Sequence, residues 1–160
     1  MRYWDDIRVG DRYAVGQHTF SAAEIKAFAG RFDPQLFHLD ESAAGRSHFG
    51  ALCASGWHTA VVWMRLMVEY HRREDEALRA RGDAVAMLGP SPGVRDLKWL
   101  KPVYVGDTIS YVTEVTATRS SNSRPGWGLL TMLSTGVNQR RETAISFVST
   151  TFVARRPASP

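Results

Sequence analysis

Cysteine is nearly absent from this chain of 160 residues, because Cys53 is the only one. No disulfide can form within the chain, so the fold must hold without covalent cross-links, and we expect a reducing, cytoplasmic setting. A lone cysteine also leaves no Cys and His spacing that suits zinc, so we expect no metal site. Cys53 is therefore predicted to be a small core residue.

Long hydrophobic runs are also missing. No stretch of about 18 apolar residues is present, so no membrane span is expected. The first residues, MRYWDDIRVGDRY, contain acids and aromatics where a secretory signal would have a basic flank followed by an apolar run. We expect no export signal here.

The sequence has no basic run with interleaved aromatics, although its net charge is +4 and its pI is near 9.6. Its arginines are scattered, so no nucleic-acid partner is expected, whereas a small phosphate-bearing ligand fits the charge. Gly-rich nucleotide loops and a Gly-x-Ser-x-Gly elbow are absent too. With no internal repeat, residues 1–160 are predicted to form one domain, with a flexible tail from about 155 to 160.

Short helices are predicted in the first third of the chain. Ser21 with Glu24 three residues later forms a capping box, and Gly30 is expected to end that helix. Pro34 disfavours helical backbone for the residue before it, so an irregular loop is expected from there. Asp40 can cap a second short helix.

One segment differs from these, because residues 57–68 (WHTAVVWMRLMV) are apolar almost all the way round. Such a helix is expected to be enclosed by other structure, and the residues Trp57, Trp63, Met64 and Met67 are interpreted as core packing. The sequence turns charged after Glu69, which indicates emergence into solvent before a linker near Gly82.

The second half is typical of strands, expected at 94–100, 108–118, 127–137 and 143–154. Within 108–118, alternation places Ile109, Tyr111, Val115 and Ala117 on one face, as in a half-buried antiparallel strand. Long antiparallel strands after one apolar helix predict an α+β domain whose sheet curves around that helix.

Two signals for chemistry lie close together in sequence. Asp33 and His38 are five apart on the Pro-containing loop, and a carboxylate beside an imidazole can transfer protons near neutral pH. The second signal is Ser55-Gly56 at the start of the apolar helix, where free N–H groups and the helix dipole favour a developing oxyanion. Each has a plainer interpretation, namely chance spacing and an ordinary helix start.

The segment Asp33-Pro-Gln-Leu-Phe-His38, followed by Gly56, resembles the hydratase motif of the MaoC-like family. That resemblance implies a hot-dog fold, a curved antiparallel sheet wrapped around a long central α-helix. It also implies that Asp33 and His38 are the catalytic pair and that the Gly56 N–H contacts the thioester carbonyl. The family's Asn, Pro and aliphatic positions are here Gln35, Leu36 and Phe37.

The implied function is a hydro-lyase that adds water to an enoyl thioester, or dehydrates the 3-hydroxyacyl thioester, in fatty acid metabolism. The substrate would be carried by coenzyme A or acyl carrier protein, with no further cofactor. An acyl-CoA thioesterase and a non-catalytic acyl-thioester-binding subunit are the alternatives. The resemblance also implies a homodimer or higher homo-oligomer, since a curved sheet leaves exposed edges.

The remaining candidates are a histidine and several cations. His58 lies one turn inside the apolar helix and is interpreted as a core histidine with a hydrogen-bond partner. Cations available for the coenzyme phosphates are Arg95, Lys98, Lys101 and Arg124.

Overall fold

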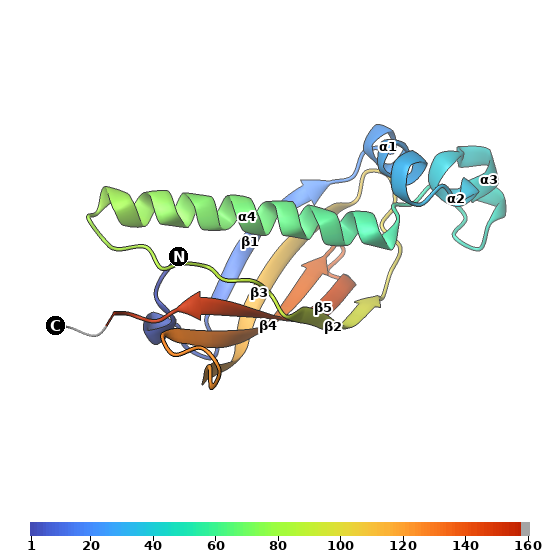
Figure 1. Cartoon of the computed structure of the whole chain (residues 1–160). Helices are drawn as coiled ribbons and strands as arrows, with labels where there is room; N and C mark the ends of the chain where they lie inside the picture. Colours follow the sequence, from blue (N-terminus) through green and yellow to red (C-terminus); the bar gives the residue numbers. More distant parts are fainter. Residues whose placement is uncertain (158–160) are drawn as a thin grey trace.

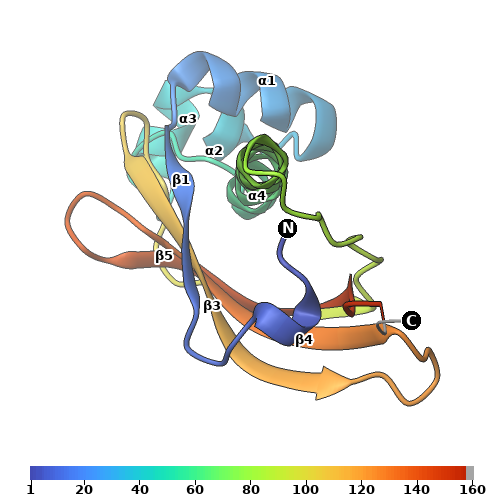
Figure 2. The same cartoon turned by 90° about the vertical axis from the view of Figure 1, so that its left-hand side faces the viewer.

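The computed structural model describes residues 1–157 and has one antiparallel sheet of five strands with one long helix across its concave face (Figures 1 and 2). The strand order is β1-β3-β4-β5-β2, so β1 and β2 are the two edges. The strands are β1 (Arg12–Thr19), β2 (Gly93–Trp99), β3 (Thr108–Ser120), β4 (Trp127–Val137) and β5 (Thr143–Ala154). This is the α+β arrangement that the sequence predicts.

Three short helices lie beside the start of the long one (Figure 1). They are α1 (Ala22–Phe32), α2 (Leu36–Leu39) and α3 (Glu41–Arg46), and a 3-10 turn, η1 (Trp4–Asp6), precedes β1. The predicted capping box of α1 is present, since Ser21 accepts from the Glu24 N–H and Glu24 accepts from the Ser21 N–H. The predicted end at Gly30 is wrong, because the helix continues to the residue before Asp33 and Pro34.

The long helix α4 (Gly56–Ala80) begins where the sequence predicts, with Ser55 as its N-cap. Its inner face packs on the sheet through buried side chains that include Val62, Trp63, Leu66 and Met67. The prediction that this helix is enclosed on all sides is wrong. An apolar stripe of α4, made up of Trp57, Val61, Met64 and Val68, is between 52% and 60% exposed, because a single sheet covers only one side of a helix.

The sheet's curvature coincides with irregularities in strand pairing, one of which corrects a prediction. Ile109, Tyr111 and Val115 of β3 are buried as expected, but Ala117 is exposed. The register between β3 and β4 shifts between Val115 and Ala117, and such a bulge reverses the faces that follow it. Thr113, which alternation also places inward, is buried and bonds to Ser134.

The first strand, β1, was not predicted. Its pairing with β3 is interrupted between Ala14 and Gly16, so the sequence does not alternate cleanly there. At the other end of the chain, Arg155 and Arg156 form ion pairs with Asp5 and Asp6 of η1, which anchors the start of the expected tail. Residues 158–160 of that tail lie outside the described residues. No helix in the described part of the chain is long and apolar enough to cross a membrane.

Candidate active site

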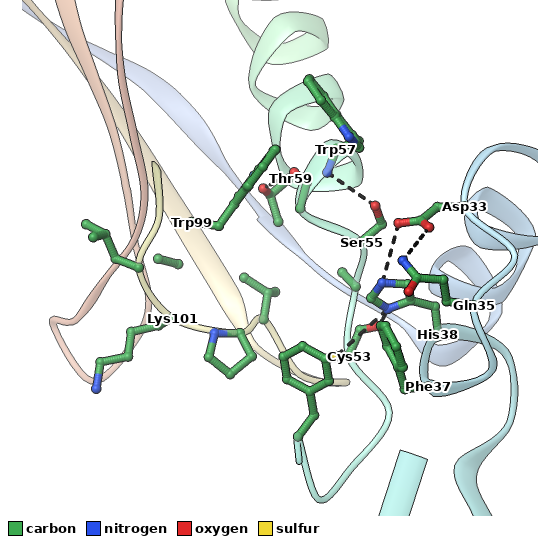
Figure 3. Close-up of a pocket in the computed structure, with 17 residues that line it drawn as sticks. Asp33, Gln35, Phe37, His38, Cys53, Ser55, Trp57, Thr59, Trp99 and Lys101 are labelled. Carbon is green, nitrogen blue, oxygen red and sulfur yellow. Dashed lines mark hydrogen bonds and ion pairs between the residues drawn. The ribbon is translucent and has the colours of Figure 1, made fainter. Parts of the chain in front are cut away.

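A cavity of about 430 Å³ lies where the short helices meet the start of α4 and the end of β2 (Figure 3). All three predicted site residues line it: Asp33, His38 and Gly56. The rest of the wall comes from parts of the chain far apart in sequence, including Cys53, Ser55, Thr59, Trp99, Lys101, Val103 and Ala144. The fold therefore brings together the residues that were predicted to act together.

Asp33 is placed by the end of α1. Its N–H donates to the Ala29 carbonyl as the last bond of that helix, and Pro34 then stops helical continuation. His38 was expected on an irregular loop, but residues 36–39 form one helical turn, α2, so the prediction is wrong for these residues. The turn brings the His38 ring back toward Asp33, with 3.5 Å between His38 Nε2 and Asp33 Oδ2.

His38 is anchored through its other ring nitrogen. Nδ1 lies 2.7 Å from the Cys53 carbonyl oxygen, and a carbonyl can only accept, so Nδ1 carries the proton of this bond. In the neutral ring Nε2 is then an acceptor that faces Asp33. The Cys53 segment is itself fixed, because the neighbouring Ala54 N–H donates to the Val103 carbonyl at 2.7 Å.

The pKa of Asp33 is lowered although burial acts in the opposite direction. Burial raises it, but hydrogen bonds from Gln35 and Ser55 and the nearby His38 together outweigh that effect. Asp33 is therefore a carboxylate at neutral pH. An ionised carboxylate oxygen and a neutral imidazole nitrogen, both acceptors, can share the two protons of one water molecule.

Gly56 is required by packing rather than by backbone conformation. A Cβ built on Gly56 would lie only 2.5 Å from the Trp99 indole, so no larger residue fits without displacing that ring. In the described part of the chain the Gly56 N–H donates no hydrogen bond, as expected for the first turn of a helix. A carbonyl oxygen in the cavity can accept from this group, at the positive end of a helix of 25 residues.

Other residues of the cavity had weaker signals in the sequence. Ser55 was named with Gly56 for the N–H groups at the helix start, but the effect of its buried hydroxyl, which helps to lower the pKa of Asp33, was not predicted. Trp99 packs edge to face on Trp57 with 5.1 Å between ring centroids, and nothing in the sequence pairs a β2 residue with the start of α4. Among the four cations named above, only Lys101 lines the cavity. The Cys53 thiol is buried as predicted, and burial raises its pKa to about 11.

His58 does not line this cavity. It is buried as predicted, stacked on Phe28 with 4.5 Å between ring centroids, and burial lowers its pKa to about 4. The expected hydrogen-bond partner is missing for Nδ1 among the described residues. No cluster of three metal-ligating side chains occurs within residues 1–157.

Comparison with known proteins gives the family. A family model described as MaoC like domain matches residues 8–128. The chain belongs to this family.

Its relatives include proteins of known structure. The chain is 39% identical to a MaoC-like dehydratase from Rhodospirillum rubrum, with a TM-score of 0.80 over 98% of this chain and 99% of that one. It is 26% identical to the uncharacterized protein YdeM of Bacillus subtilis (strain 168) over 136 residues, 85% of this chain and 87% of YdeM. An (R)-hydratase from A. caviae involved in PHA biosynthesis shares the fold, at 23% identity and a TM-score of 0.64 over 95% and 98% of the two chains. The hot-dog fold that the sequence predicts is thereby confirmed.

Proposed function

We propose that the protein is a hydro-lyase that adds water to an enoyl thioester, or removes water from the 3-hydroxyacyl thioester. One observation carries the proposal: Asp33 and His38 face each other across 3.5 Å in a cavity that is also lined by Gly56, the first residue of α4. Membership of a family that contains dehydratases supports the same reaction. The substrate would be carried by coenzyme A or acyl carrier protein, and we expect no further cofactor.

The chemistry follows from the roles that the geometry allows. A water molecule held by Asp33 and His38 loses a proton to the pair as its oxygen attacks C3 of the enoyl group. The negative charge that develops on the thioester oxygen is stabilised by the Gly56 N–H. The pair then returns the proton to C2, so the sum of the steps is addition of one water across the double bond, and dehydration is the reverse.

The test is turnover of crotonyl-, longer and branched enoyl-coenzyme A, followed by loss of the absorbance of the conjugated thioester. Asp33→Asn and His38→Ala should each lower kcat/KM by about 10²- to 10⁴-fold, the usual contribution of a general acid-base group. Asp83→Asn makes the same change at an exposed residue outside the cavity, and should leave turnover unchanged. Full activity in the Asp33 and His38 variants would remove this mechanism.

Product analysis separates the alternatives. Release of free thiol without a 3-hydroxyacyl product would identify a thioesterase. Tight binding of acyl-coenzyme A across chain lengths with no turnover would identify a non-catalytic subunit.

The proposal includes self-association, because the apolar stripe of α4 is not covered by the sheet and is exposed. Among residues 1–157 the edge strand β2 has no partner strand on its outer side, and Val94 and Trp99 of β2 and the following Leu100 are also exposed. A second copy of the chain would cover both features at once. We therefore expect a homodimer at least.

Light scattering tests this expectation. Val61→Asp should shift the mass toward the monomer at micromolar concentration, because a charge would be buried in the interface. Glu69→Asp, which changes an exposed residue of the same helix without altering charge, is the control. A concentration-independent monomer mass for the unaltered chain would contradict the expectation.

A further inference from the structure

Gln35 stands between the two members of the candidate pair and is bonded to both. Its side-chain Nε2 donates to Asp33 Oδ1 at 2.8 Å (Figure 3). A carboxylate oxygen only accepts, so the amide must present its NH₂ group to Asp33. The other carboxylate oxygen, Oδ2, is the one that faces His38 at 3.5 Å.

The backbone of Gln35 holds the second member. Its carbonyl accepts from the His38 N–H at 2.9 Å, which is the first bond of α2, and its own N–H donates to the Asp33 carbonyl at 2.7 Å. The backbone bonds follow from the turn and any residue could make them. The side-chain bond depends on the amide group, and it reaches across Pro34 to the residue two positions earlier.

From this geometry we propose that Gln35 is a positioning residue, which occupies Oδ1 of Asp33 and so leaves Oδ2 alone to meet water and His38. The role rests on the proposed function for its effect on turnover, but not for its effect on the carboxylate itself. The role is assigned to a position at which this chain departs from the family motif, since it has Gln35 where the motif has the shorter amide Asn.

Charge supports the same role. The titratable groups that line the cavity with Asp33 are His38, Cys53 and Lys101. Of these, only His38 acts on the carboxylate, and it joins the Gln35 and Ser55 hydrogen bonds in lowering a pKa that burial raises. Loss of the Gln35 donor removes one stabilising bond to the charged form, so the pKa of Asp33 should rise.

The experiment replaces Gln35 with Met, which has similar length and no donor. Gln35 is exposed, so the fold should persist, and thermal unfolding checks this. Carbon-13 NMR of labelled Asp carboxyl groups, with Asp33→Asn for assignment, should show that the pKa of Asp33 is higher in Gln35→Met than in the unaltered chain. Gln17→Met makes the same change at an exposed glutamine of β1 outside the cavity, and should leave that pKa unchanged.

Steady-state turnover is the second measurement. In Gln35→Met, kcat should fall by about 10- to 100-fold with KM nearly unchanged, as expected when a catalytic group is misaligned. The acidic limb of the pH profile of turnover should shift to higher pH as the pKa of Asp33 rises. Gln35→Asn should retain more of the kcat than Gln35→Met. An Asp33 that titrates at the same pH in Gln35→Met, or a kcat equal to that of the unaltered chain, overturns the proposal.

The two proposals fail separately. The NMR titration needs no substrate, so it tests Gln35 even if no enoyl thioester is turned over. Absence of turnover in the unaltered chain, together with the expected pKa rise in Gln35→Met, would reject the hydro-lyase and keep the positioning role.

Discussion

Two histidines, His38 and His58, are buried to a similar extent but have different neighbours. His38 and His58 are 5% and 7% exposed. His38 is anchored at Nδ1 by a carbonyl and presents Nε2 to a carboxylate in a cavity. His58 is packed between Phe20 and Phe28, and its Nδ1 has no partner within the described residues. Burial alone therefore does not separate the two histidines; His38 differs in having one anchored ring nitrogen and one that faces a carboxylate in a cavity.

The same substitution at both positions should separate the two roles most widely. His38→Phe should lower kcat/KM by about 10²- to 10⁴-fold, because it removes the acceptor at Nε2. His58→Phe keeps an aromatic ring against Phe20 and Phe28 and should change kcat/KM by less than about threefold. Steady-state kinetics on one enoyl thioester measures both. Equal losses of kcat/KM at the two positions would contradict a difference in role between His38 and His58.

Lowering the pH should affect His58 through the free energy of unfolding rather than through turnover. In the unfolded chain His58 takes up a proton near its ordinary pKa of about 6.5, whereas in the folded chain the pKa is about 4. Between these values the unfolded state binds more protons, so stability is lost as the pH falls from 6.5 to 4. The loss attributable to His58 is on the order of 3 kcal/mol.

Urea unfolding at several pH values checks this expectation. His58→Phe should flatten the curve between pH 4 and 6.5. His48→Phe, at an exposed histidine, should leave the slope as it is in the unaltered chain. An unchanged slope in His58→Phe would show that other groups set the acid sensitivity.

Gly56 lines the same cavity as His38 and is the first residue of α4, two positions before His58, and its replacement should have a smaller effect than loss of His38. Gly56→Ala keeps the N–H but pushes the Trp99 indole away, and we expect kcat/KM to fall by about 10- to 100-fold. In a Trp99→Ala background the added methyl group meets no indole, so the further loss should nearly vanish. A loss of the same size in both backgrounds would place the cause in the backbone instead of the contact.

Local signals in the sequence predicted much of this fold. The capping box at Ser21 and Glu24 needs only four residues, and β4 and β5 begin and end where the sequence predicts. A bulge carries no comparable local signal, so β1 was missed and Ala117 was assigned to the wrong face. The apolar stripe of α4 was taken for core, because residue pattern does not distinguish a face covered by the chain's own sheet from one left open.

The candidate site was predictable where its residues are close in sequence. Asp33 and His38 share one short segment, and the glycine at the start of a helix is a recognisable feature. Trp99 and the Cys53 carbonyl were not predictable as site components. The first comes from a strand at the opposite edge from β1, and the second is a backbone group whose role depends on where residues 52–54 run beside residues 103–105.

Cys53 has a consequence for any thioester that enters the cavity. Its sulfur lies 3.8 Å from His38 Nδ1, beside the groups proposed to handle an acyl chain. An ionised thiol there would capture the acyl group by exchange and leave the protein acylated. With its pKa raised to about 11 by burial, roughly one thiol in several thousand is ionised at pH 7.5. The same burial that makes Cys53 a packing residue would therefore protect the chain from acylation by the thioester proposed as its substrate.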